Sequence, residues 1–180
     1  MLTILSLCDK TGAWSEPYVK AGYDVRRIDL TYGSDIRLFQ ALPYPVRGIL
    51  AAPPCTEFAA SGARWWAGKG EQVLLDALAI VDACLRVITV HQPQWWVLEN
   101  PVGRLKDYLG QPRMSFDPSD YGDPYTKKTL LWGHFKEPRM KPVEATEGSK
   151  MHLLPPSPDR AALRSITPSG FAQAFFEANP

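Results

Sequence analysis

The sequence comprises 180 residues, of which 45% are hydrophobic, so one sizeable core can be buried and extended disorder is excluded. A formal net charge of +1 excludes a polycation, so any contact with nucleic acid must come from a local patch. The three cysteines lack zinc-binding spacing and are odd in number, which argues against a disulfide framework. No signal peptide is indicated, and charges interrupt the longest apolar stretch (residues 77–90). We therefore expect a cytoplasmic protein with no membrane segment and no metal site.

Short β-rich runs alternate with helical stretches along the chain, which is typical of an α/β protein with a parallel sheet. The predicted strands cover residues 3–8, 24–30, 47–52, 94–99 and 130–135. The predicted helices cover residues 15–21, 71–90 and 169–178, and the second is the clearest because its apolar residues recur at helical spacing. Residues 136–160 are rich in Pro, Lys and Glu and indicate a surface excursion. Because no linker separates two cores, we expect a single domain over residues 1–180.

Residues suited to ligand binding and catalysis follow four of these strands directly, and in open α/β sheets ligands bind at the carboxyl ends of strands. Residues 8–12 form a glycine-containing turn after the first strand, and Asp29 ends the second, where an acid commonly accepts hydrogen bonds from a ribose. Cys55 follows two prolines after the third strand, and Glu99 ends the fourth. The glycine turn and the acid are a weak signal, whereas a cysteine at one strand end and a carboxylate at the next are more specific.

Six segments resemble, in order, the motifs of the DNA cytosine-5 methyltransferase family. Residues 51–59, Ala-Ala-Pro-Pro-Cys-Thr-Glu-Phe-Ala, resemble its Pro-Pro-Cys nucleophile motif, and residues 98–101, Leu-Glu-Asn-Pro, resemble its Glu-Asn motif. Residues 5–15 are similar to the cofactor loop, and Asp29 and Asp35 match the two acids on the cofactor side. Residues 121–128 resemble the motif that carries Pro-Gln and arginines, and residues 164–168, Arg-Ser-Ile-Thr-Pro, resemble the late Arg-x-Leu-Thr-Pro element. Small chains of this pattern resemble phage and prophage members.

The resemblance implies a Rossmann-like S-adenosylmethionine-dependent methyltransferase fold, with a mostly parallel sheet and helices on both faces. It implies methyl transfer from S-adenosylmethionine to carbon 5 of cytosine in DNA, through a covalent cysteine adduct at ring carbon 6. The implied catalytic residues are Cys55, Glu99, Asn100 and Lys127. The implied cofactor-binding residues are Cys8, Asp9, Lys10, Thr11, Gly12, Trp14, Asp29, Asp35 and Pro53.

The proposed chemistry accounts for these residue types. Carbon 5 of cytosine becomes nucleophilic once a thiolate adds at carbon 6, which requires Cys55 to have thiolate character on a rigid, exposed turn. Glu99 would donate a proton at ring nitrogen 3, with a pKa raised in a closed pocket, and Asn100 would orient the loop. The base must be flipped out of a duplex, and residues 56–70 are suited to a mobile loop that closes over it. The DNA-binding candidates in that loop are Arg64, Trp65, Trp66 and Lys69.

The sequence also departs from the family pattern. Only residues 130–163 are left for target recognition. The recognised DNA sequence would therefore be short, sequence selectivity would be nearly absent, or recognition would be supplied by a recognition subunit or a homo-oligomer. The family's final Gly-Asn motif is not recognisable. Asp9 and Lys10 replace expected glycines, and Lys127 and Thr129 fall where arginines often occur. Lys10 is suited to pairing with an added carboxylate on a modified S-adenosylmethionine, in which case a group other than methyl would be transferred.

Alternative interpretations remain open. The chain would instead be a catalytically idle, methyltransferase-like DNA-binding module or one half of a split enzyme, which the short recognition region favours and the Cys55 and Glu99 pair opposes. A nucleotide-binding oxidoreductase of similar topology predicts Gly-x-Gly-x-x-Gly after the first strand, and the sequence has none. Cys8 and Cys84 are also typical of core cysteines, Lys127 of a solvated lysine, and residues 65–66 of a tryptophan pair packed on the domain.

Overall fold

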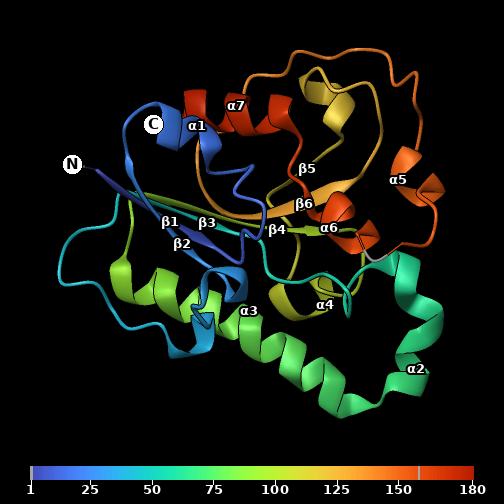
Figure 1. Cartoon of the computed structure of the whole chain (residues 1–180), viewed down its shortest axis with the longest axis horizontal. Helices are drawn as coiled ribbons and strands as arrows, with labels where there is room; N and C mark the ends of the chain where they lie inside the picture. Colours follow the sequence, from blue (N-terminus) through green and yellow to red (C-terminus); the bar gives the residue numbers. More distant parts are fainter. Residues whose placement is uncertain (1, 158) are drawn as a thin grey trace.

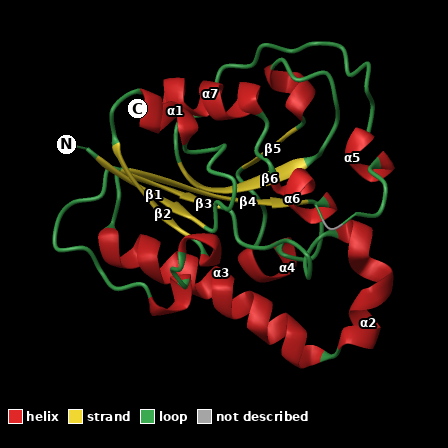
Figure 2. Cartoon of the chain, viewed as in Figure 1, coloured by secondary structure: helices red, strands yellow, loops and turns green. Residues whose placement is uncertain are grey.

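A six-stranded sheet forms the middle layer of the structure, a computed structural model that describes residues 2–157 and 159–180 (Figures 1 and 2). The order across the sheet is β2-β1-β3-β4-β6-β5. Strand β6 is antiparallel to both of its neighbours, β4 and β5, so the other five strands share one direction. The predicted α/β class is therefore confirmed, and the sheet is parallel from β2 to β4 and antiparallel at β6. The strands are β1 (Thr3–Leu7), β2 (Asp24–Ile28), β3 (Gly48–Ala51), β4 (Trp95–Pro101), β5 (Met114–Phe116) and β6 (Thr129–His134).

Helices cover both faces of the sheet, as predicted. Helix α3 (Glu71–His91) crosses one face, and α1 (Glu16–Lys20) and α7 (Ser169–Ala178) lie against the other (Figure 1). Neighbouring residues of β1 point to opposite sides, so Leu5 joins the core under α3 while Ile4 joins the core under α7. A strand buried on both faces reads as a continuous apolar run, which is why these strands were recognisable in the sequence.

The remaining helices are short, and none was predicted. The α-helical turns are α2 (Trp66–Lys69), α4 (Lys106–Leu109), α5 (Lys150–Leu153) and α6 (Arg160–Ser165). The 3₁₀ turns are η1 (Leu30–Tyr32), η2 (Ile36–Leu38), η3 (Ala60–Trp65) and η4 (Pro118–Tyr121). Helices α2, α5 and α6 lie beyond the end of the sheet toward which the parallel strands run, whereas both termini lie at the other end (Figure 1).

Three elements differ from the sequence prediction. Strand β5 was missed because three residues at a sheet edge carry too little periodicity to detect. Strand β4 continues through Pro101, two residues beyond the predicted end at residue 99. Strand β3 has already ended at this level of the sheet, so Pro101 pairs only with Thr129 of β6. Residues 56–70, expected to be a mobile loop, are largely the helical turns η3 and α2.

The sheet has a topological switch point between β1 and β3. From β1 the chain passes to β2 on one side and then returns to β3 on the other side of β1. Loops that leave the two strands in opposite directions open a crevice at their carboxyl ends, where open α/β sheets bind ligands. The loops beginning at Cys8 and at Ala52 flank this crevice. No helix among the described residues is long and apolar enough to cross a membrane.

Candidate active site

The turn that carries Cys55 is held from three sides. Its start is fixed to the sheet because the Ala52 amide donates to the Leu7 carbonyl at 2.9 Å. The Cys55 carbonyl accepts from the amides of Phe58 and Ala59 at 2.9 and 2.8 Å, which folds the chain into a tight turn. Two prolines precede Cys55 and remove backbone freedom on that side. A cysteine placed in this way presents its sulfur at one defined position, half-buried at the end of β3.

Asn100 joins this turn to the next strand end. Its side-chain amide donates to the carbonyl of Pro53 at 3.0 Å, which is the orienting hydrogen bond expected from the sequence. Asn100 is completely buried, and its Oδ1 has no partner among the described residues. Pro53 is also buried, and its carbonyl is engaged by Asn100.

The loops that follow β3 and β4 are also paired through their backbones. Ala59 and Gly103 form an antiparallel bridge, and the Arg104 amide donates to the Phe58 carbonyl at 2.9 Å. A Cβ on Gly103 would lie 1.8 Å from the Phe58 carbonyl oxygen, so only glycine allows this approach. The loop that carries the cysteine is therefore bonded to the loop that follows the strand of the carboxylate, although 44 positions of the chain separate Ala59 from Gly103.

Glu99 is half-buried on β4, and its electrostatic surroundings match the sequence prediction. Burial raises the pKa of its carboxyl group; the negative charge of Asp9 raises it further, and the positive charge of Lys127 partly opposes this rise. No donor among the described side chains forms a hydrogen bond with the Glu99 carboxylate. A carboxyl group with a raised pKa and no protein donor is prepared to hold a proton and donate it to a ligand.

Cys55 differs from its prediction. Burial raises the pKa of its thiol, and the negative charge of Glu99 raises it further, while Lys127 and Arg164 lower it. The net shift is upward, so the resting side chain is a thiol, without the thiolate character expected from the sequence. The physical reason is that the turn is half-buried beside a carboxylate, not exposed beside cations alone.

Lys127 lies at the same end of the sheet, just before β6. Its ammonium group is 3.4 Å from the Ile166 carbonyl and its backbone amide donates to Asp117. A cavity of about 10 Å³ lies beside Glu99 and Lys127, with Thr129 and Thr167 in its wall. This volume admits one water at most, so a larger ligand in this cavity would require these side chains to part.

The loop after β1 is organised around the buried carboxylate of Asp9. This carboxylate accepts hydrogen bonds from Ser6 Oγ at 2.8 Å, Ser15 Oγ at 3.0 Å and the Gly12 amide at 2.9 Å. Gly12 has φ +71°, and an added Cβ would lie 2.4 Å from the guanidinium carbon of Arg27, which supports the loop from below. The geometry therefore shows Asp9 and Gly12 shaping the loop, whatever contact they make with a ligand.

The remaining cofactor candidates in this loop differ in accessibility. Lys10 and Thr11 are exposed, and their backbone amides have no acceptor among the described residues. Cys8, with φ +58°, turns its half-buried side chain toward the core beside Cys84. Trp14 has no exposed surface and packs against α7, so it is a core residue and offers no surface to a cofactor. The sequence has no signal that distinguishes a core role from a cofactor contact for an aromatic residue next to a glycine turn.

The two acids that follow β2 cap 3₁₀ turns. Asp29 Oδ1 accepts from the Thr31 amide at 2.8 Å and from its hydroxyl at 2.6 Å, whereas Oδ2 has no protein partner among the described residues. Asp35 caps the next turn and uses both carboxylate oxygens to bind Arg37, which lowers the pKa of Asp35. Leu30, beside Asp29, is 71% exposed. Asp29 thus retains a free oxygen for a ligand, while Asp35 is engaged by its own neighbour.

The four DNA-binding candidates divide into two pairs. Lys69 forms an ion pair with Glu57 at 2.7 Å, and Trp66 lies beneath the Arg104 guanidinium, 4.3 Å from its ring centre. Trp65 is 60% exposed and has Arg64 over its ring. Intramolecular contacts therefore engage Trp66 and Lys69, whereas Arg64 and Trp65 face outward.

Several contributors were not singled out by the sequence. Arg104 donates to the Glu57 carbonyl at 2.7 Å and stacks on Trp66, so it fastens the segment after Cys55. Arg164 belongs to a quoted motif but was given no role, and it bears on Cys55 through its charge. Arg104 lacked any recognisable pattern, whereas the position of Arg164 within a motif was a usable signal.

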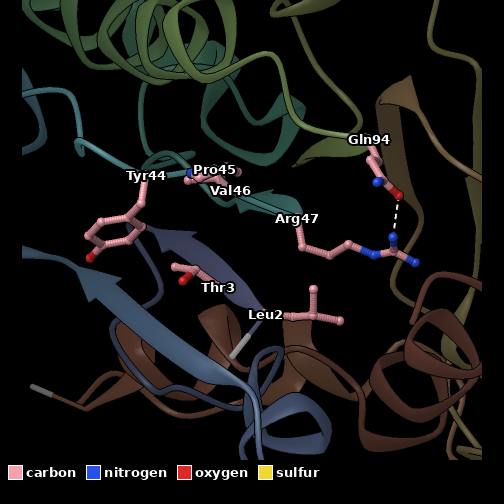
Figure 3. A pocket seen from close by; sticks show the side chains of 7 residues that line it. All are labelled: Leu2, Thr3, Tyr44, Pro45, Val46, Arg47 and Gln94. Carbon is pink, nitrogen blue, oxygen red and sulfur yellow. Dashed lines mark hydrogen bonds between the residues drawn. The ribbon is translucent and has the colours of Figure 1, made fainter.

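A larger groove of about 380 Å³ lies at the opposite end of the sheet, at the amino ends of β1, β3 and β4. Figure 3 shows Tyr44 and Leu2 at this groove, with the Arg47 guanidinium hydrogen-bonded to Gln94. None of the predicted site residues lines it. Among the described residues, no cluster of His, Cys, Asp or Glu is suited to holding a metal ion.

The comparisons with known proteins concern the fold. Neither a family model nor a curated protein matches the sequence. A solved structure does match: a protein described, without an established activity, as a DNA modification methyltransferase encoded within an E. coli prophage, at a TM-score of 0.53 and 18% identity. The two chains share a fold. The match covers 80% of this chain and 53% of the other, so the present chain spans about half the length of that protein.

Proposed function

We propose that the chain transfers a methyl group from S-adenosylmethionine to carbon 5 of cytosine in DNA, with Cys55 as the nucleophile. The supporting observation is that Cys55 and Glu99, at adjacent strand ends beside the switch point, are close enough for the charge of Glu99 to raise the pKa of the thiol. This reaction needs one nucleophile and one proton donor held together, and the paired loops provide that arrangement.

The cofactor fits the residues around the switch point. S-adenosylmethionine, when bound, supplies an electrophilic methyl group carried on a sulfonium ion. The free amides of Lys10 and Thr11 are suited to a carboxylate, and the unpaired Oδ2 of Asp29 is suited to ribose hydroxyls. The exposed side chain of Leu30, next to Asp29, would pack against the adenine ring of the cofactor. Trp14 takes no part in this fit because it is buried.

The residues of this chain perform the chemical steps as follows. Cys55 gives its proton to water and forms an Sγ–carbon 6 bond, while Glu99 donates a proton at ring nitrogen 3 so that the ring electrons collect at carbon 5. After carbon 5 has gained the methyl group, its own proton passes to water, the carbon 5–carbon 6 double bond re-forms, and the thiolate departs with the electron pair. Ring nitrogen 3 then returns its proton to Glu99. Asn100 keeps the turn in place throughout by its hydrogen bond to Pro53.

Contact with DNA would fall to the outward-facing pair on η3. The exposed ring of Trp65 provides a stacking surface, and Arg64 provides a cation for the phosphate backbone. Because the space beside Glu99 is so small, the flipped base would enter only when the residues around it move apart. Such an enzyme would act in the cytoplasm, where reducing conditions keep Cys55 free and where a phage-encoded protein meets DNA.

A covalent trap tests the proposal. Fluorine at carbon 5 cannot leave as a proton does, so DNA containing 5-fluorocytosine should remain bonded to the enzyme in the presence of S-adenosylmethionine. We expect a denaturation-resistant adduct with the wild-type protein and with the core variant Cys84→Ala, and none with Cys55→Ala. Absence of an adduct with single-stranded and duplex DNA of varied sequence would contradict the proposal and favour an idle binding module or a split enzyme.

A variant of the reaction is favoured by Lys10. Its side chain is exposed at the switch point and forms no ion pair among the described residues, so it is available to bind a carboxylate on a modified cofactor. Mass spectrometry of DNA from cells that express the protein distinguishes the two products. A carboxymethyl group on cytosine that disappears in Lys10→Ala would support the variant, and 5-methylcytosine as the sole product would exclude it.

A further inference from the structure

Helix α6 reaches the segment that begins with Cys55, although the two are far apart in sequence. Arg164 donates from Nη2 to Ser61 Oγ at 3.3 Å, across 103 positions of the chain. Ser61 belongs to η3, which follows the Cys55 turn. Ala59, the residue that precedes η3, donates its amide to the Cys55 carbonyl. Arg164 as a whole is half-buried, and its hydrogen bond to Ser61 is exposed to solvent. The α6 contact therefore positions a guanidinium next to the nucleophile's own loop.

The residues after α6 continue along the same site. The Ile166 carbonyl lies 3.4 Å from the Lys127 ammonium group, and Thr167 and Pro168 lie in the wall of the small cavity beside Glu99. One continuous stretch, residues 164–168, thus contacts the cysteine loop, the lysine and the cavity of the carboxyl group. We call this stretch the α6 strap.

The charges that act on Cys55 come from three separate elements. Burial and the negative charge of Glu99 of β4 oppose ionisation of the thiol. The positive charges of Lys127, which precedes β6, and Arg164 of α6 favour it. A guanidinium is a permanent cation that forms several hydrogen bonds, so it can hold its contact with Ser61 and still act on a nearby anion. Nucleophilic attack requires the anionic sulfur, which this buried site otherwise disfavours.

We propose that Arg164 is a positioning residue for the reaction proposed above: tethered to Ser61, it brings a positive charge to Cys55 and stabilises the thiolate on which attack depends. The inference rests on the proposed function for its biological meaning, but the charge effect on the thiol is measurable without any substrate. It also gives the α6 strap a role in a chain whose predicted recognition region is short.

The test is the pH dependence of Cys55 alkylation by iodoacetamide, resolved from Cys8 and Cys84 by peptide mass spectrometry. A cation nearby favours the thiolate, so its removal raises the pKa of the thiol and moves the alkylation midpoint to higher pH. In Arg164→Gln we expect alkylation of Cys55 at neutral pH to slow by about three- to tenfold, the effect of half to one pH unit. Arg164→Lys should restore most of the rate, and Arg139→Gln, which removes an exposed arginine elsewhere, should match wild type.

Thermal unfolding of each variant verifies that the comparison is made on folded protein. If the pH midpoint of Cys55 alkylation in Arg164→Gln equals that of wild type, the inference is overturned, whatever the fluorocytosine trap shows. A shifted alkylation midpoint together with the absence of a fluorocytosine adduct would overturn the proposed function. The effect of the Arg164 charge on Cys55 would still hold. Ser61→Ala keeps the guanidinium and removes its tether, so a smaller shift in the same direction would support the tethered geometry.

Discussion

The two ends of the sheet differ in what they offer to a ligand. The amino ends of the strands border a groove of about 380 Å³ that is lined by none of the predicted site residues. The carboxyl ends border a cavity of about 10 Å³ that is lined by Glu99, Lys127 and Thr167 of the α6 strap, and the charges of Glu99 and Lys127 act on Cys55. Reactive groups that raise or lower each other's pKa identify a site better than open volume does. The small cavity is what a closed site that must open for its substrate would show.

The largest expected effect compares a variant at the carboxyl ends of the strands with a variant at the amino ends. Cys55→Ala should lower methyl transfer to DNA by on the order of 10⁴-fold or more, because it removes the sulfur that forms the adduct in the proposed reaction. Tyr44→Ala, at the groove of Figure 3, should leave the rate unchanged. Transfer of tritium from labelled S-adenosylmethionine measures both. Equal loss in the two variants would make the groove part of the site.

Glu99→Gln should lower the rate by about 10²- to 10⁴-fold, since it removes the proton donor at ring nitrogen 3. The same change should act on Cys55 in the opposite sense. The negative charge of Glu99 raises the pKa of the thiol, so its neutral replacement lowers that pKa and moves alkylation of Cys55 to lower pH. Because burial raises the pKa of Glu99, wild-type activity should decline as the pH rises through that raised pKa, and the variant should lack that decline. An unchanged alkylation midpoint would show that the two groups do not interact.

The tryptophan pair should separate binding from stability. Trp65→Ala should weaken DNA affinity by about 1–3 kcal/mol, the worth of one stacked base, with little change in the unfolding temperature. Trp66→Ala should do the reverse and cost about 1–2 kcal/mol of stability, because its ring packs beneath Arg104. Fluorescence anisotropy with labelled DNA and urea unfolding measure the two quantities. Equal effects of both changes on DNA affinity would contradict this division.

The smallest effect is expected for Lys69. Its ammonium group is already paired with Glu57 at a partly exposed position, so Lys69→Ala should lower the free energy of unfolding by less than about 1 kcal/mol. DNA affinity should change less than in Arg64→Ala, whose guanidinium has no carboxylate partner among the described residues. The slope of affinity against salt concentration tests this, because removing one cation that binds a phosphate reduces the slope by about one.

Much of the frame was predictable because it follows from local patterns. Strands β1, β3 and β4 are apolar on both faces, and α3 carries its apolar residues at helical spacing, so each was recognised within a few residues of its ends. Cys55 and Glu99 were singled out because each directly follows or ends a predicted strand. Proximity of the two follows from the rule that parallel strands end at one edge of the sheet.

The roles of individual side chains were less predictable because they depend on contacts across the chain. The sequence places Trp14 in a cofactor loop, whereas in the structure α7, from the other end of the sequence, buries it. Asp35 and Lys69 read as free charges until Arg37 and Glu57 are seen to pair with them. Cys55 reads as a thiolate until burial and Glu99 are seen to raise its pKa.

The sequence by itself determined the α/β alternation, the approximate positions of five strands and the two residues at the centre of the proposed chemistry, because these follow from periodicity and chain order among neighbouring residues. Only the tertiary structure decided the direction of the Cys55 pKa, the pairing of the loops through Gly103, and the presence of Arg164 beside a loop 103 positions away. Electrostatic interactions act through space, and the distances that govern them exist only once the chain has folded.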